Sequence, residues 1–232
     1  MNTQKTAERV QWMLEHKVVG FFDAPVQLKS GRMSHWYINW RSVAEDVYLL
    51  DQITDEVLAF AREQGLDPAC FYGVAEGASK LAVLCQYKWA CSQENYGPGS
   101  HKLVMGRGKA KAHGAAKDRY FLGVPEGPTL VLEDVTTTGG SLIQTLEQLQ
   151  ALDIPILGAL SLTDRLEPRD DGRYVRDVLE EMGVPFYTLC DARALLPAAI
   201  AHYQPADSIQ QHLRDERSAL NAFNPFQTEE TR

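Results

Sequence analysis

The sequence predicts an α/β protein in which a parallel sheet is flanked by helices. From about residue 70 onward, short apolar runs that suit strands alternate with amphipathic stretches that suit helices. In addition, 232 residues with 44% hydrophobic and 23% charged side chains can bury one large core. We expect a single domain, with a core at about 65–192, a small N-terminal unit at about 18–48 and a C-terminal helical extension at about 193–232.

The N-terminal elements are predicted to be a helix, a hairpin and a second helix. Residues 5–17 carry apolar side chains at helical spacing. Residues 20–42 are rich in aromatic and β-forming side chains, and the Ser-Gly pair at 30–31 separates two such runs, which indicates a hairpin. Residues 49–64 form another amphipathic stretch, which ends at Gly65.

The alternating part supplies the predicted sheet. Its strands are expected at residues 71–74, 102–105, 129–132, 156–162 and 184–189. Its helices are expected at residues 80–91, 141–152 and 174–181. Because ligands bind beyond the carboxyl ends of parallel strands, the loops after Val74, Met105, Leu132 and Leu162 are the expected functional segments. Beyond residue 205 the tail is polar, but Leu213 and its apolar neighbours support one more helix.

Composition excludes several classes of protein. No apolar run reaches the roughly 18 residues of a membrane-spanning helix. The formal net charge of −8 argues against binding a nucleic acid over the whole surface. The four cysteines form neither a C-x-x-C pair nor a zinc-type cluster, which favours free thiols in a reducing compartment. We therefore expect a cytoplasmic protein with no membrane partner and no nucleic-acid partner.

The strongest functional signal is the segment Thr129–Ser141, which reads TLVLEDVTTTGGS. An apolar strand is followed by Glu133 and Asp134, then by a Thr/Gly loop and a helix. The glycines allow close approach of the backbone, Ser141 suits a helix cap, and the amides of the first helical turn attract an anion. Adjacent carboxylates would repel a phosphate unless they bind sugar hydroxyls or hold magnesium. A ribose 5-phosphate satisfies both parts; the alternative is an ordinary strand-to-helix turn with solvated acids.

A second signal is the basic segment 101–119, which contains six Lys or Arg residues against one acid. Its glycines and alanines predict a mobile loop. Such a loop suits capture of a pyrophosphate leaving group, because it can close over the anion and exclude water. A solvated surface loop and a local nucleic-acid patch are the alternatives.

The Thr129–Ser141 segment resembles the phosphoribosyl pyrophosphate (PRPP) signature of the type I phosphoribosyltransferases. No P-loop and no dinucleotide-binding glycine motif competes with it. The order R-x-x-x-K-x-H-G in the basic segment resembles the catalytic loop of the orotate phosphoribosyltransferase family, in which the loop closes over the neighbouring subunit's site. The resemblance implies catalytic roles for Arg107, Lys111, His113, Glu133 and Asp134. It implies PRPP binding by these five residues and by Lys109, Val135, Thr136, Thr137, Thr138, Gly139, Gly140 and Ser141.

Three further segments carry the same resemblance. The first, Leu28–Arg32 with the residues after it, is similar to the family's N-terminal hood. The second, Phe71–Ser79, is similar to its pyrophosphate loop, which implies a cis peptide at Ala75-Glu76. The third ends in Asp164-Arg165. Orotate is implied to contact Lys29, Tyr37, Ile38, Thr137 and Arg165, the last through the carboxylate that distinguishes orotate from other bases. Relatives often carry lysine where this chain has Glu76 and Gly108.

The resemblance implies an enzyme that converts orotate and PRPP to orotidine 5′-monophosphate and pyrophosphate. Mg²⁺ is the implied cofactor, held mainly by PRPP and water rather than by direct side-chain ligands. A homodimer with the basic loop acting across the interface is also implied. Two alternatives stay open at this point: a phosphoribosyltransferase for another base, and a non-enzymatic regulator that senses PRPP.

Overall fold

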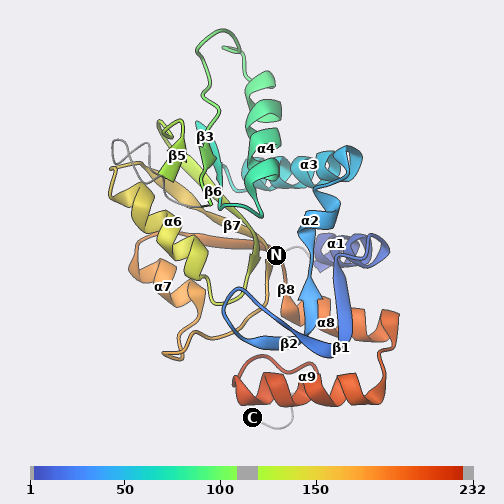
Figure 1. Cartoon of the computed structure of the whole chain (residues 1–232). Coiled ribbons are helices and arrows are strands. Elements are labelled where there is room, and N and C mark those ends of the chain that lie inside the picture. Colours follow the sequence, from blue (N-terminus) through green and yellow to red (C-terminus); the bar gives the residue numbers. More distant parts are fainter. Residues whose placement is uncertain (1–2, 109–119, 227–232) are drawn as a thin grey trace.

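The computed structural model describes residues 3–108 and 120–226. Its centre is a sheet of four strands in the order β3-β6-β7-β8, and every neighbouring pair is parallel. The strands are β3 (Cys70–Gly73), β6 (Thr129–Thr136), β7 (Ile156–Asp164) and β8 (Phe186–Asp191). The predicted parallel sheet is therefore confirmed, with β6 and β7 at its centre (Figure 1).

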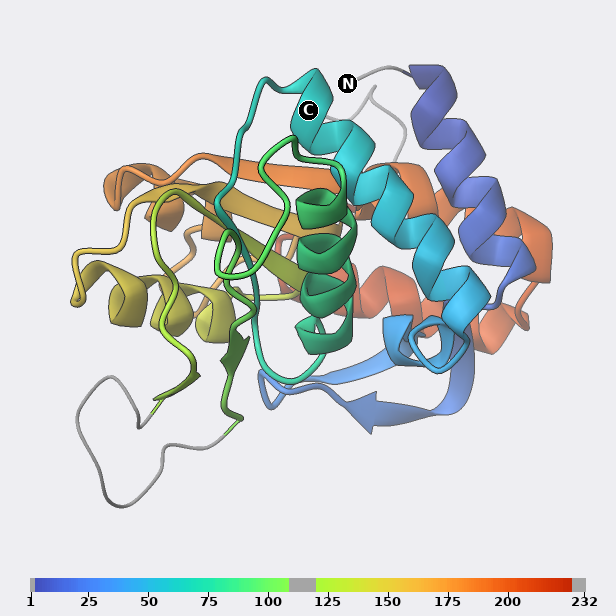
Figure 2. The same cartoon turned by 90° about the horizontal axis from the view of Figure 1, so that it is seen from above.

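Helices cover both faces of this sheet, as the sequence predicts. On one side lie α6 (Gly140–Gln150) and α7 (Val175–Glu181). On the other side lie α1 (Thr3–Glu15), α3 (Val47–Glu63), α4 (Ser79–Cys91) and α8 (Ala192–Tyr203). Figures 1 and 2 show α6 on one side and α1, α3 and α4 together on the other.

The alternating direction of side chains along the strands explains why helices pack on both faces of the sheet. Leu130 and Leu132 of β6 pack in the core cluster under α1, α3, α4 and α8, whereas Val131 between them packs in the cluster under α6 and α7. Both faces are buried because successive strand side chains point in opposite directions. Within the described residues, no helix is both long and apolar enough to cross a membrane.

The N-terminal unit is an antiparallel hairpin of β1 (Val19–Gln27) and β2 (Met33–Ile38), followed by the short helix α2 (Trp40–Val43). Its turn contains Gly31 at φ +85°, so the Ser-Gly turn predicted from the sequence is confirmed. The last helix, α9 (Asp207–Ala219), runs beneath this hairpin in Figure 1. We call the unit of β1, β2 and α2 the hood.

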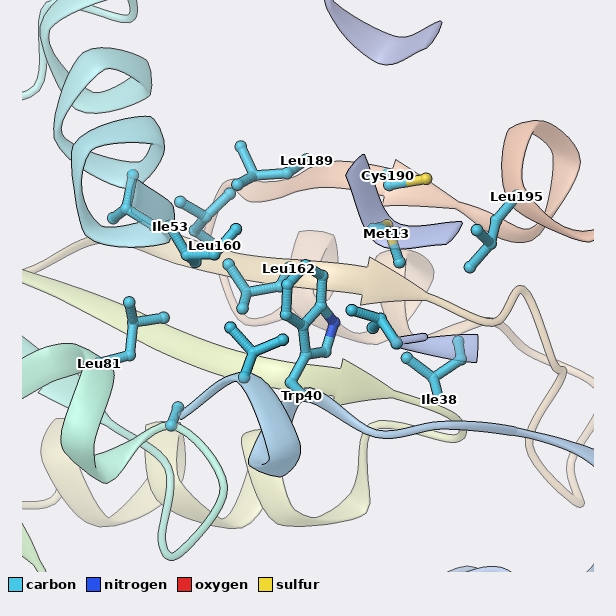
Figure 3. Packing of buried hydrophobic residues seen from close by; sticks show 14 of the residues in the cluster. Met13, Ile38, Trp40, Ile53, Leu81, Leu160, Leu162, Leu189, Cys190 and Leu195 are labelled. Carbon is cyan, nitrogen blue, oxygen red and sulfur yellow. The ribbon is translucent and has the colours of Figure 1, made fainter. Parts of the chain in front are cut away.

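Buried side chains tie the hood to the sheet (Figure 3). Trp40 of α2 packs in the same cluster as Met13 of α1, Leu162 of β7 and Leu189 of β8. Its indole N–H also donates to Thr163 Oγ1 at 3.0 Å. The hood is thus held against the carboxyl ends of the strands, where ligands of parallel sheets bind.

Three local expectations were wrong. Residues 102–105 do not form a strand of the main sheet; β4 (Met105–Gly106) pairs antiparallel with β5 (Phe121–Leu122), so that the two strands lie on either side of residues 107–120 in the sequence. Strand β6 runs four residues further than predicted, because its end continues to pair with β7 as far as Thr136. The N-cap of α6 is Gly139 rather than Ser141, which lies inside the helix.

Candidate active site

A cleft of about 350 Å³ opens at the carboxyl end of the sheet, between the β6–α6 turn and the hood. It joins segments that are far apart in the sequence: Lys29 from the hood, the Ala75–Gly77 loop, the acids of β6 and Arg165 after β7. Of the predicted site residues, it is lined by Lys29, Tyr37, Ile38, Glu133, Asp134, Val135, Thr137, Thr138, Gly139, Gly140, Ser141 and Arg165. The geometry therefore places the two expected halves of the site, sugar-phosphate and base, in one cavity.

Two predicted residues with described positions lie outside this lining. Thr136 is buried in the sheet, and its hydroxyl donates to Ser161 Oγ at 2.9 Å. Arg107 follows β4, and its backbone N–H donates to the Tyr120 carbonyl at 2.8 Å. The Nε of Arg107 is buried without a hydrogen-bond partner among the described residues. Lys109, Lys111 and His113 lie outside the described residues.

The β6–α6 turn is shaped by two glycines with different surroundings. Gly139 has φ +73°, and a Cβ there would lie only 2.3 Å from Val175 Cγ2. Gly140 has nothing within 4 Å of its Cβ position, so its side faces open space. The first amides of α6 have no partner inside the helix. Together with the adjacent threonines, these amides form a cradle for an anion at the helix N-terminus.

The two acids of β6 differ in environment. Glu133 is only 7% exposed, whereas Asp134 is partly exposed. Burial, followed by the neighbouring Asp134, raises the pKa of Glu133 well above its usual range, and Lys29 opposes this shift only in part. Glu133 is therefore a weaker acid in this cleft than a solvent-exposed glutamate would be.

The Phe71–Ser79 loop approaches these acids closely. The Ala75-Glu76 peptide is cis, as the resemblance implies. A Cβ on Gly77 would lie 2.2 Å from Asp134 Oδ2, so only glycine leaves room for that carboxyl. A Cβ on Gly108 would lie 2.7 Å from Glu76 Oε1. The two positions at which the chain departs from the family pattern are thus neighbours in space.

Arg165 lies at the base end of the cleft but is 1% exposed. Its Nε donates to Glu167 Oε1 at 2.8 Å, and its Nη2 lies 2.8 Å from the same oxygen. Nη1 donates to the Trp36 carbonyl at 3.2 Å, and the guanidinium stacks over the Trp36 ring at 4.0 Å. A role in binding a carboxylate stays a prediction, because the structure places these protein partners around the guanidinium.

The cleft also contains residues that sequence reasoning missed. Asn39, Trp40 and Arg41 follow the predicted Tyr37-Ile38 wall directly, and Gln144 lies one helical turn after Gly140. Gln144 could have been found from that four-residue spacing on one helix face. Among the described residues, no three His, Cys, Asp or Glu side chains gather closely enough to hold a metal ion by themselves.

Solved structures with similar folds include orotate phosphoribosyltransferases. Orotate phosphoribosyltransferase from Aeropyrum pernix matches with a TM-score of 0.60 and 23% identity, over 81% of this chain and 96% of that chain. Leishmania donovani UMP synthase matches with a TM-score of 0.68 and 18% identity; the match covers 93% of this chain but only 42% of that longer chain. The chain therefore has the fold of solved phosphoribosyltransferases.

No protein-family model matches the chain. The orotate phosphoribosyltransferase of Bradyrhizobium diazoefficiens is 32% identical over 205 residues, which are 84% of this chain and 99% of the relative. The enzyme of the same name from Aquifex aeolicus is 24% identical over 82% of this chain and 97% of that relative. The chain belongs to the orotate phosphoribosyltransferase family.

Proposed function

We propose that the protein transfers the 5-phosphoribosyl group from PRPP to orotate, giving orotidine 5′-monophosphate and pyrophosphate. One observation carries the proposal: a single cleft joins the acid-plus-glycine turn of β6–α6 to the hood and to Arg165. A site for a sugar phosphate alone would not need the hood. A site for a planar base alone would not need an anion cradle beside two acids.

The sugar-phosphate end would hold the substrate through both of its polar parts. The 5′-phosphate would accept hydrogen bonds from the first amides of α6 and from Thr137 and Thr138. Glu133 and Asp134 would bind the ribose hydroxyls. As the bond to pyrophosphate breaks, the anomeric carbon acquires oxocarbenium character, and the negative field of these acids would favour that cation.

The leaving group and the base would be handled by different residues. Arg107, Lys109, Lys111 and His113 would neutralise the departing pyrophosphate, by the resemblance of the basic segment to the family's catalytic loop. Thr137 and Arg165 would orient orotate while its ring nitrogen attacks the anomeric carbon. Direct displacement requires no covalent nucleophile on the protein.

Mg²⁺ belongs to the proposal as a cofactor that enters with PRPP. The donor set fits this mode, because hard carboxylate oxygens stand in the cleft at Asp134 and Glu133, whereas the described residues form no three-ligand cage. Asp134 and Glu133 would then reach the ion through water. When bound, the ion withdraws electron density from the leaving pyrophosphate.

A homodimer is also proposed. It is supported by apolar side chains that are exposed around α4 and the β4–β5 arms: Tyr87, Tyr96, Leu103, Met105 and Leu122. Because β4 and β5 lie on either side of residues 107–120 in the sequence, a partner on this surface would lie beside both ends of that stretch. Mixing Lys111→Ala and Asp134→Asn chains should restore part of the activity; no restoration in a verified heterodimer would place the loop in its own subunit.

We also propose a cytoplasmic location, in keeping with four unpaired cysteines among the described residues.

The function is tested by following the ultraviolet absorbance of orotate during incubation with PRPP. The expected result is orotate loss that requires PRPP, stops on addition of a metal chelator and returns with excess Mg²⁺. Other bases, including uracil, adenine and hypoxanthine, should neither react nor compete. Turnover of one of these in place of orotate would make the chain a phosphoribosyltransferase for another base. PRPP binding without turnover of any base would make it a regulator.

A further inference from the structure

The C-terminal helix α9 carries a buried arginine that reaches the base end of the cleft. Arg217 is 1% exposed. Its Nη1 donates to the carbonyl of Arg165 and its Nη2 to the carbonyl of Leu166, both at 3.1 Å. Its Nε donates to the Phe223 carbonyl, which ties the segment directly after α9 to the same point. One guanidinium therefore spans from the tail to the turn after β7.

That turn has a strained backbone. Leu166, directly after Arg165, has φ +52°, a conformation that a leucine rarely adopts. Such residues persist only where their surroundings hold them. The Leu166 N–H donates to Asp164 Oδ1 at 2.9 Å, and its carbonyl accepts from Arg217. Arg217 thus binds the carbonyl oxygens of both peptide groups that flank the Leu166 Cα.

The residue before Arg217 holds the other side of Arg165. Glu216 Oε2 lies 3.0 Å from Ser34 Oγ, and Glu216 Oε1 accepts the His35 N–H at 2.8 Å. Ser34 Oγ in turn accepts from Arg165 Nη2 at 3.1 Å. Figure 1 shows α9 running beneath the β1–β2 hairpin that carries these residues. Neighbouring residues of α9 therefore fix both the turn and the hood strand between which the Arg165 guanidinium lies.

Arg217 also shares the counter-ion of Arg165. The buried Glu167 Oε1 lies 2.8 Å from Arg165 Nη2 and 3.6 Å from Arg217 Nη1. Arg32 is the third guanidinium nearby, with Nη1 3.7 Å from Glu167 Oε2, and its Nη2 bonds Asp170 at 2.9 Å. Because Glu167 lies close to more than one guanidinium group, its negative charge is shared among them and does not compensate Arg165 alone. Without Arg217, the pairing of Glu167 with Arg165 would tighten.

From these contacts we infer that Arg217 is a positioning residue for recognition of the base. It holds the Asp164–Glu167 turn and shares Glu167, so that Arg165 keeps its place in the cleft wall and can pair with an anionic base. The inference rests on the proposed function, since it takes Arg165 as the group that meets the carboxylate of orotate. It gives the C-terminal helix a part in substrate selection.

The test compares Arg217→Ala and Arg217→Lys with Arg214→Ala in the full-length chain. Arg214 lies on the same helix, but stacks on Phe226 and donates to Gln211, away from the turn. The kcat, the KM for orotate, the KM for PRPP and the melting temperature are measured for each variant. Arg217→Ala should raise the KM for orotate on the order of tenfold, as expected for losing charge-assisted hydrogen bonds, while the KM for PRPP stays within about twofold.

The lysine variant separates positioning from folding. Arg217→Lys keeps the positive charge, but a single ammonium group cannot donate to both the Arg165 and Leu166 carbonyls in the geometry of a guanidinium. Its KM for orotate should therefore lie between those of wild type and Arg217→Ala. If Arg217→Ala does not fold, Arg217→Lys decides by itself. Equal rises of both KM values, or a lower melting temperature with an unchanged KM for orotate, would make Arg217 merely structural. A wild type that does not consume orotate refutes the proposed function; an active wild type with unaffected Arg217 variants refutes only this inference.

Discussion

The two ends of the cleft are built in opposite ways. The sugar-phosphate end comes from one continuous segment, in which β6, its acids and the first turn of α6 follow each other along the chain. The base end is assembled from the hood, the turn after β7 and helix α9. The first end is held by local backbone geometry, whereas the second depends on long-range contacts. The difference predicts that mutations at the two ends change different measured quantities.

The largest effect is expected at the sugar-phosphate end. Asp134→Asn removes a charge that the proposed mechanism places beside the reacting ribose, so kcat should fall on the order of 10²- to 10³-fold, as when one charge-stabilising group is lost. The melting temperature should change little, because Asp134 is partly exposed. Steady-state kinetics and thermal unfolding measure both quantities. Asp153→Asn, at an exposed turn, is the matched control. An active Asp134→Asn enzyme would remove the acids from the mechanism.

Next in size is a contrast between the two glycines of the turn. Gly139→Ala should lower the free energy of unfolding by about 2–4 kcal/mol, because φ +73° and contact with Val175 both oppose a Cβ. Gly140→Ala should leave the free energy of unfolding close to that of wild type, because its Cβ would meet no other atom of the protein. It should raise the KM for PRPP, because the same Cβ would occupy space in the cleft that the proposal gives to the phosphate. Denaturant unfolding and kinetics separate the two. Equal loss of stability in both variants would mean that the turn is not shaped as described.

A smaller effect is expected where the pyrophosphate loop meets the start of the basic segment. Gly108→Lys alone should be neutralised by Glu76, whereas Gly108→Lys in a Glu76→Ala background leaves the new lysine free to bind pyrophosphate. The KM for PRPP should therefore fall only in the double variant, with a coupling free energy of about 1 kcal/mol. A double-mutant cycle on KM measures it. Additive effects would show that the two positions do not interact.

The last prediction concerns pH at the base end. Burial raises the pKa of Asp164 from 3.8 to about 6, so the folded state holds this proton more tightly than the unfolded chain. Stability from this group is therefore greatest below pH 3.8, and is lost as the pH rises through about 6. Asp164→Asn keeps an acceptor for the Leu166 N–H but does not titrate. Its melting temperature should exceed that of wild type above pH 6.

This gain should shrink as the pH falls towards 4, because Asp164 in the folded wild type is then protonated and no longer buries a charge. Melting curves between pH 4 and pH 8 follow the difference, with Asp153→Asn as an exposed control. A difference between wild type and Asp164→Asn that is constant across this range would contradict the raised pKa. The experiment sharpens the comparison of the two ends, because it probes the turn that Arg217 holds.

Much of this protein could be predicted from its sequence. The alternation of apolar runs predicted all four strands of the parallel sheet, and the Ser-Gly pair predicted the hood hairpin. The segment Thr129–Ser141 predicted the turn that lines one end of the cleft, because its acids, threonines and glycines are contiguous. Such features are local: side-chain periodicity and turn chemistry act over a few residues.

Only the tertiary structure decided the rest. The strand expected at 102–105 is instead a short arm of an antiparallel pair, because an apolar run does not specify its partner. The burial of Glu133 and the meeting of Gly108 with Glu76 depend on packing between distant segments. The same is true of Arg217, whose place on a polar C-terminal helix gave no sign that it would hold the turn beside Arg165. The acid-and-glycine motif is contiguous in the sequence, whereas the base end of the cleft forms only when the hood, the turn after β7 and helix α9 pack together.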